Sequence, residues 1–262
     1  METPFLGIAL ATMARLNGLS FTAVVDPKTT STNLRLLRTF GANVEMVTES
    51  DGGGGYLGTR VRRARELAAS SPNSVWVNQY ANELNWRAYY ETAGSEILAA
   101  LDEPVDYLVA AVSTTGSILG LARRLRERFP RLQVVAVDAV GSVIFGAESG
   151  TREIPGYGAS RVPELLDPTE IDHVIHVDDA EAAHGCRQLV ASEGILGGGS
   201  SGAVVAAIGQ LIHEVPSGSR ILTLLPDRGE RYLDSVYDDD WLQSVTAMEN
   251  GDKRGQLVRA GA

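Results

Sequence analysis

The stretch Val105-Asp106-Tyr107-Leu108-Val109-Ala110-Ala111-Val112 runs directly into Ser113-Thr114-Thr115-Gly116-Ser117, and this junction decides the fold. The first part has the nearly continuous apolar character of a strand buried on both faces. The second part is a loop of small residues, and a helical pattern follows from about Ile118. The first N–H groups of a helix have no partner within it, and its dipole favours negative charge there. The junction therefore predicts a βα unit with a site for a phosphate group.

A second loop of small residues, Gly197-Gly198-Gly199-Ser200-Ser201-Gly202, precedes the apolar helical run 203–208. Either loop alone could be a plain helix-capping turn. Two of them in one chain indicate a phosphorylated cofactor held at two places. In the first loop no lysine follows the glycine, so it is not a Walker A motif, and it lacks the Gly-x-Gly-x-x-Gly spacing of dinucleotide sites. A monophosphate therefore fits this loop best.

Outward from this junction, helical and strand-like apolar patterns alternate along the chain. Strands are expected at 19–25, 44–47, 75–77, 105–112, 134–137, 171–177 and 221–225. Helices are expected around 6–13, from 30 to near 41, and at 57–68, 93–101, 117–128, 179–192 and 201–214. This alternation predicts an α/β fold with parallel sheets covered by helices on both faces.

We expect two domains with a boundary near residue 80. Residues 1–80 would form a partial small α/β domain, 81–248 a larger cofactor-binding α/β domain, and 249–262 a frayed tail. The first domain is expected to be incomplete, because a parallel sheet whose chain opens on a helix lacks a preceding strand.

Composition excludes several classes of function. The chain has 262 residues and a net charge of −10, without a basic patch, so neither nucleic acid nor an anionic membrane is an expected partner. No apolar stretch is long enough to span a bilayer, and the start lacks a signal-peptide pattern. The single cysteine, Cys186, reads as a small buried hydrophobe, which fits a cytoplasmic protein. The four histidines lack metal-ligand spacing, so no metal site is expected.

The motif Glu193–Ala203, which contains the second loop, resembles the signature of the cysteine synthase branch of fold type II pyridoxal-phosphate enzymes. The stretch 226–232 (Pro-Asp-Arg-Gly-Glu-Arg-Tyr) resembles the C-terminal motif of that branch, and 41–45 one of its helix-to-strand turns. Further stretches at 24–28, 78–86, 112–117, 141–146 and 158–164 resemble the synthases that join O-phospho-L-serine to L-glutamate on the route to 2,3-diaminopropionate, in siderophore and antibiotic pathways.

The resemblance implies the two-domain fold of these enzymes, pyridoxal 5'-phosphate as cofactor and a homodimer. It implies that Ser113, Thr114, Thr115, Gly116 and Ser117 hold the cofactor phosphate. It also implies that Ser200 hydrogen-bonds the pyridine nitrogen.

Three further residues are candidates for substrate binding. Arg60 could hold the carboxylate of the second substrate, Tyr80 could set a hydroxyl over the site, and Arg161 could meet a phosphate leaving group. A surface or structural role is the alternative for each of them.

The lysine that forms the Schiff base in this family has no counterpart here, because the two lysines, Lys28 and Lys253, lie in other contexts. No catalytic residue is therefore assigned in this chain. The family's Ser-Gly-Asn loop should precede Leu6, where this chain has Thr3-Pro4-Phe5. These departures lead us to expect an N-terminally truncated member of the family.

Two other functions remain open. One is a catalytically inactive protein that keeps the fold to bind a ligand or a partner. The other is a different β-replacement activity, such as cysteine synthesis.

Overall fold

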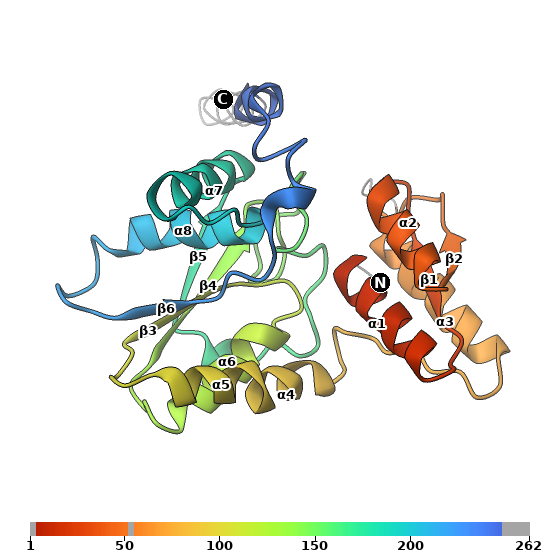
Figure 1. The fold of residues 1–262 in the computed structure, drawn as a ribbon, viewed down its shortest axis with the longest axis horizontal. Coiled ribbons are helices and arrows are strands. Elements are labelled where there is room, and N and C mark those ends of the chain that lie inside the picture. The colour runs from red at the N-terminus through yellow and green to blue at the C-terminus, as the bar shows by residue number, and fades with distance from the viewer. Residues whose placement is uncertain (1–3, 52–54, 248–262) are drawn as a thin grey trace, which may run out of the picture. The chain divides into compact units, whose positions relative to one another are not determined.

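The computed structural model describes residues 4–51 and 55–247, and it divides the chain into two compact units, 1–79 and 80–262. We describe each unit by itself (Figure 1). The expected tail at 249–262 lies outside the described residues.

The first unit contains a small parallel sheet of two strands, β1 (Thr22–Val25) and β2 (Asn43–Met46), in register from Thr22 opposite Asn43 to Val25 opposite Met46. Its helices are α1 (Pro4–Leu16), α2 (Ser31–Thr39) and α3 (Leu57–Ser70). Helix α2 begins where its sequence predicts, because the Thr30 hydroxyl accepts a hydrogen bond from the Asn33 N–H. Helix α1 is followed by Gly18 in the left-handed conformation, as expected for a helix stop.

The expected strand at 75–77 is wrong. These residues form no strand, and the Val75 side chain is 85 % exposed. A strand needs a partner for its backbone groups. In the described part of this unit, β1 and β2 pair only with each other.

The second unit contains a four-stranded parallel sheet in the order β5-β4-β3-β6. Its strands are β3 (Tyr107–Ala111), β4 (Gln133–Ala139), β5 (His173–Val177) and β6 (Ile221–Thr223). Helices α4 (Leu84–Glu91), α5 (Ala93–Ala100) and α6 (Gly116–Arg126) lie on one side of the sheet (Figure 1). Helices α7 (Asp179–Glu193) and α8 (Gly199–Leu211) lie on the other side. Short 3-10 turns occur at Pro168–Glu170 and Gly229–Arg231.

The two central strands are buried on both faces, as their unbroken apolar sequences predict. Leu108 and Val109 of β3 and Val134 to Val137 of β4 have no exposed surface. The core between the sheet and the helices α7 and α8 includes Val109, Val135, Val177, Ala183 and Val204. Helix α4 was not predicted from the sequence.

The strand order reverses beside β3. The chain passes from β3 to β4 and β5 in one direction and then returns through α7 and α8 to β6, on the other side of β3. Ligands of open parallel sheets bind outside the carboxyl ends of the strands at such a reversal. The first loop of small residues leaves the carboxyl end of β3 and therefore lies at this position.

Candidate functional site

The first loop joins β3 to α6 through an unusual backbone conformation. Thr115 is the N-cap of α6 and has a φ of 63°, a left-handed conformation that costs a non-glycine residue free energy. The Thr115 hydroxyl donates to the Thr114 carbonyl at 2.7 Å, and no side chain caps the helix. The amide groups of the first turn of α6 are thus left for a ligand.

The Thr114 hydroxyl accepts a hydrogen bond from a side chain outside the loop. Asn85, in the first turn of α4, donates its Nδ2 hydrogen to Thr114 Oγ1 at 2.9 Å. A hydroxyl that accepts one hydrogen bond still has its own hydrogen to donate. Ser113, Thr114 and Ser117 are partly exposed, whereas Thr115 is 1 % exposed. The loop therefore turns three hydroxyl-bearing residues toward solvent and one inward.

The second loop leads into α8 and is bonded to the segment after β6. The Gly198 N–H donates to the Asp227 carbonyl at 3.0 Å, and the Gly229 N–H donates to the Leu196 carbonyl at 2.9 Å. A Cβ on Gly198 would lie 1.9 Å from Asp227 Oδ1, so only glycine fits there. The motifs 193–203 and 226–232, which carry the family resemblance, are thus hydrogen-bonded to each other.

Ser200 lies in the first turn of α8 and is 5 % exposed. Because α8 precedes the parallel strand β6, its N-terminus lies at the same edge of the sheet as the N-terminus of α6. Within the described residues, no hydrogen bond joins Ser200 to the 113–117 loop. The structure brings the two helix ends to one edge without joining them directly.

Asp227 is a half-buried carboxylate at this edge that the sequence did not single out. Its Oδ2 accepts the hydroxyl hydrogen of Tyr232 at 2.7 Å. Burial raises the pKa of Asp227, and burial together with the Asp227 charge raises that of Tyr232. The Tyr232 hydroxyl thus releases its proton less readily than in water, and the Asp227 carboxylate takes one up more readily.

Tyr80 and Arg161, two predicted substrate residues, lie together. The Arg161 guanidinium stacks over the Tyr80 ring at 4.9 Å from its centroid, and Tyr80 is 2 % exposed. Arg161 also pairs with Glu164. The Leu165 N–H donates to the Tyr80 carbonyl at 2.9 Å, which ties the segment after Arg161 to the entry of the second unit.

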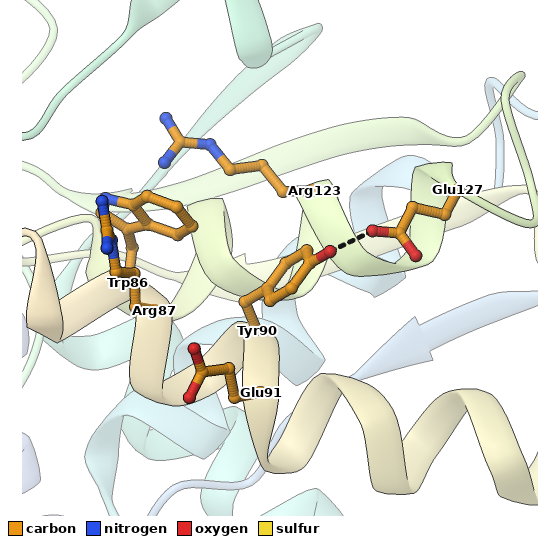
Figure 2. A pocket seen from close by; sticks show the side chains of 6 residues that line it. All are labelled: Trp86, Arg87, Tyr90, Glu91, Arg123 and Glu127. Carbon is orange, nitrogen blue, oxygen red and sulfur yellow. Dashed lines mark hydrogen bonds between the residues drawn. The ribbon is translucent and has the colours of Figure 1, made fainter.

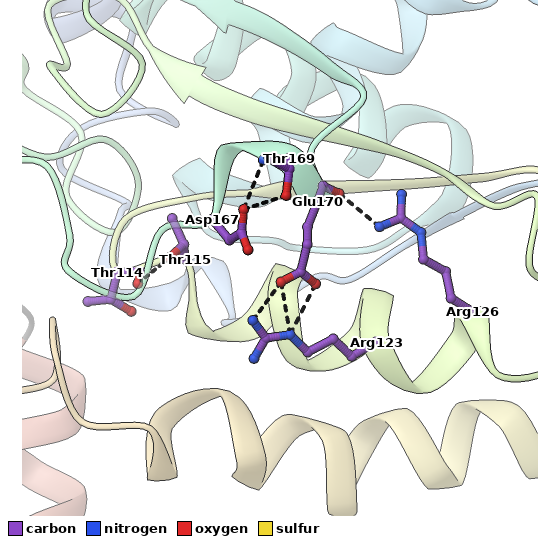
Figure 3. A network of polar contacts seen from close by, with 7 residues as sticks. All are labelled: Thr114, Thr115, Arg123, Arg126, Asp167, Thr169 and Glu170. Carbon is purple, nitrogen blue, oxygen red and sulfur yellow. Dashed lines mark hydrogen bonds and ion pairs between the residues drawn. The ribbon is translucent and has the colours of Figure 1, made fainter.

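A polar network holds the far end of α6 to the segment before β5 (Figure 3). Arg123 pairs with Glu170 at 2.6 Å, and the backbone carbonyl of Glu170 accepts from Arg126 at 3.0 Å. Asp167 caps the short 3-10 turn through the Thr169 N–H at 3.0 Å. These contacts fix the helix whose N-terminus carries the candidate phosphate site.

A groove of about 440 Å³ between α4 and α6 lies on the outer side of these helices. Figure 2 shows the side chains that line it: Trp86, Arg87, Tyr90, Glu91, Arg123 and Glu127. It contains none of the predicted site residues. Its arginines already pair with carboxylates, Arg87 with Glu83 and Arg123 with Glu170.

Arg60 belongs to the first unit. It lies in the first turn of α3, and its Nε is 3.1 Å from Asp26 Oδ2, with 11 % and 9 % of the two side chains exposed. Lys28 lies in the exposed turn after β1, where its N–H donates to Asp26 Oδ1 at 2.9 Å. The structure thus gives Arg60 a carboxylate partner that the sequence did not predict.

Cys186 is fully buried and in reduced form, and its thiol donates to the Gly198 carbonyl at 3.3 Å. This burial confirms the prediction of a packing residue, and it raises the pKa of the thiol to about 11. Over residues 4–51 and 55–247, no helix has the length and apolar character needed to cross a membrane.

Residues 6–227 match the family described as pyridoxal-phosphate dependent enzyme. The chain is 60 % identical over 246 residues to the N-(2-amino-2-carboxyethyl)-L-glutamate synthase of Ralstonia nicotianae, covering 94 % of this chain and 73 % of that protein.

Two solved structures are also similar. The O-acetylserine dependent cystathionine beta-synthase of Helicobacter pylori has a TM-score of 0.78 and 35 % identity, over 87 % of this chain and 74 % of that one. An O-ureido-L-serine synthase has a TM-score of 0.81 and 32 % identity, over 91 % of this chain and 77 % of that one.

Proposed function

Since this chain belongs to the pyridoxal-phosphate-dependent enzyme family, as an enzyme of the β-replacement type, we propose that it joins O-phospho-L-serine to L-glutamate. The product would be N-(2-amino-2-carboxyethyl)-L-glutamate, the compound in the name of the relative that is 60 % identical. The observation that carries the proposal is a hydroxyl-lined helix N-terminus at the strand-order reversal, in a chain this similar to that synthase.

The first loop fits a phosphate monoester. Thr115 adopts a costly left-handed conformation at the start of α6, and its side chain makes no capping hydrogen bond to the first amides of that helix. We propose that Ser113, Thr114, Thr115, Gly116 and Ser117 hold the phosphate. Thr115 would contribute through its backbone, because its hydroxyl donates to Thr114.

When bound, pyridoxal 5'-phosphate supplies the electron sink that lets an amino acid lose its α-hydrogen and a leaving group at Cβ. We propose that the Ser200 hydroxyl bonds the pyridine nitrogen. A neutral hydroxyl does not enforce a protonated ring as a carboxylate would, and the weaker sink favours elimination at Cβ.

The substrates carry carboxylates and a phosphate, which need positive partners. We propose that Arg60 holds the carboxylate of L-glutamate. A guanidinium has five N–H donors, so it can serve Asp26 and a substrate together. We propose that Arg161 meets the departing phosphate, in competition with Glu164, and that Tyr80 directs its hydroxyl at the substrate.

We also expect a homodimer in the cytoplasm that serves 2,3-diaminopropionate formation for a siderophore or antibiotic. Size-exclusion chromatography with light scattering tests the dimer.

The reaction itself is tested by mass spectrometry. The chain is incubated with pyridoxal 5'-phosphate, O-phospho-L-serine and ¹³C-labelled L-glutamate, with methylamine added in parallel, because Lys28 is the only lysine among the described residues and a soluble amine can replace a lysine side chain. We expect labelled product and stoichiometric phosphate.

The same assay separates the alternatives. Faster formation of cysteine when sulfide replaces glutamate would support cysteine synthesis instead. Cofactor binding without either product, with and without methylamine, would support a ligand-binding protein without catalysis.

A further inference from the structure

We propose that Asn85 is a positioning residue of the phosphate site: it holds the Thr114 hydroxyl so that its hydrogen points at the cofactor phosphate. This inference rests on the proposed cofactor binding and deepens it. Asn85 is not part of the 113–117 loop. It comes from α4, about 30 residues earlier in the chain.

The first observation is a hydrogen bond with a fixed direction. Asn85 Nδ2 is the donor and Thr114 Oγ1 the acceptor, at 2.9 Å. An amide nitrogen can only donate, so this bond occupies a lone pair of the hydroxyl and leaves its hydrogen for another acceptor. In the partly exposed loop, the remaining direction is available to a phosphate oxygen.

The second observation is the close approach of the same side chain to the helix end. A Cβ on Gly116 would lie 2.2 Å from Asn85 Oδ1 and 2.8 Å from Nδ2. The first residue of α6 is therefore glycine because Asn85 occupies the space beside it. The carboxamide thus contacts the loop at two points, Thr114 and Gly116, on either side of the left-handed Thr115.

The third observation is that α4 is packed against α6 independently of Asn85. A Cβ on Gly120 would lie 2.2 Å from the Trp86 carbonyl and 2.7 Å from the Tyr89 Cβ. The Trp86 ring also lies 4.2 Å from the Arg123 guanidinium. These contacts lie one turn further along α6 and hold the two helices together. We therefore expect α4 to stay packed on α6 when the Asn85 carboxamide is removed, so that its loss affects the loop.

The chemistry of the carboxamide also explains why this residue is an amide and not an acid. An aspartate would only accept, so it would take the Thr114 hydrogen for itself and place a negative charge beside a phosphate. The neutral carboxamide of Asn85 supplies a hydrogen-bond donor to Thr114 and places no charge beside the phosphate.

The experiment uses probes that need no lysine. The dissociation constants of pyridoxamine and of pyridoxamine 5'-phosphate are measured by fluorescence for the same protein. The constant of pyridoxamine divided by that of pyridoxamine 5'-phosphate reports the phosphate contacts alone. We expect Asn85→Ala to lower this ratio about 3- to 10-fold, which is the effect of losing one hydrogen bond between neutral groups. Asn85→Asp should lower it further. The ³¹P chemical shift of the bound probe should change in both variants.

Coupling to Thr114 distinguishes positioning from support of the fold. In a Thr114→Val background, Asn85→Ala should change the ratio less than 2-fold, about the limit for variants that share one interaction. Arg87→Ala, on the exposed side of α4, is the matched control and should leave the ratio unchanged.

Each outcome has one meaning. An unchanged ratio in Asn85→Ala, or an equal loss with and without the Thr114 hydroxyl, would overturn the positioning role. If the unaltered protein binds both probes equally, the proposed cofactor site itself is wrong.

Discussion

The two units of the chain use the same architecture with different degrees of burial. In the second unit the central strands β3 and β4 are covered by helices on both faces and are buried along their length. In the first unit β2 has no fully buried residue, and Met46 at its end is 42 % exposed. Because Ala23, Val24 and Val25 of β1 are buried as well, the difference lies in what flanks the strands. In the described residues β1 and β2 pair only with each other, whereas β3 and β4 each have a paired strand on either side.

Exposed apolar side chains point to the same difference. In the first unit Leu16, Leu19 and Val75 are 75 %, 67 % and 85 % exposed. Burying such a side chain contributes about 1.5–3 kcal/mol, which the first unit forgoes at these positions. Its buried cluster contains Ala11, Ala23, Val25 and Leu37, which are fewer residues than form the core around β4.

The largest expected effect is in amide hydrogen exchange. We expect β1 and β2 to exchange about 1,000-fold faster than β3 and β4, because local opening of the first unit exposes less apolar surface. Mass spectrometry of peptic peptides measures this. Equal protection in both sheets would contradict the comparison.

Next is the loss of an ion pair from each unit. Arg60→Ala leaves Asp26 buried without its partner and should lower the free energy of unfolding of the first unit by about 3 kcal/mol. Arg123→Ala removes the pair with Glu170, whose side chains are 28 % and 20 % exposed, and should cost the second unit about 1 kcal/mol.

Urea titration followed by exchange in each sheet separates the two costs. Asp26→Asn combined with Arg60→Ala is the control, since it removes the isolated charge and should recover part of the stability. A larger cost for Arg123→Ala would reverse the expected order.

The only cysteine offers a reporter for the second unit. With a pKa of about 11, Cys186 holds little thiolate at pH 8, so iodoacetamide should modify it about 100-fold more slowly in the native protein than in urea. Because the folded state keeps this proton between about pH 9 and 11 while an unfolded thiol releases it, stability should fall as pH rises across that range. Fast alkylation at pH 8 would mean that the second unit opens readily, which contradicts the stability expected of it.

The last comparison concerns glycines in helices, and it includes the smallest expected change, at Gly209. Gly120→Ala pushes a methyl group against the Trp86 carbonyl and should destabilise the second unit by about 1–3 kcal/mol. Gly58→Ala in α3 meets Asp51 Oδ2 at 3.3 Å and should cost the first unit less. Gly209→Ala in α8 meets nothing within 4 Å and, through helix propensity, should stabilise by up to about 1 kcal/mol. Thermal unfolding of the three variants measures the order.

The sequence predicts the second unit well because its signals are strong and local. The apolar strand at 105–112, the loop at 113–117 and the glycine loop before α8 appear where expected, with shifts of one or two residues at the ends. The strand expected at 75–77 fails because a strand depends on a neighbour, which no local pattern of valines reports. Helix α4 was missed because none of its residues is fully buried, so its sequence carries no clear apolar face.

The site was predictable only in part, for the same reason. The loop itself is contiguous and visible in the sequence. Asn85 and Asp227 become neighbours of the two loops only through packing of α4 and of the segment after β6. The pairing of Arg60 with Asp26, 34 positions apart by their numbers, likewise depends on how α3 packs on β1.

The pairing of β3 with β6 has a consequence for how the molecule is synthesised and folded. The Thr223 hydroxyl bonds the Val109 carbonyl across a sequence separation of 114 residues. Closing so long a loop is slow, so β6 is expected to dock last, after β3, β4 and β5 have formed from earlier parts of the chain. The sheet edge with the loops 113–117 and 197–202 is then complete only after β6 and the segment 226–232 have been synthesised. The proposed cofactor, pyridoxal 5'-phosphate, would therefore bind only after these strands have assembled. Its effect would be to stabilise the folded protein and slow its unfolding, not to speed the early steps of folding.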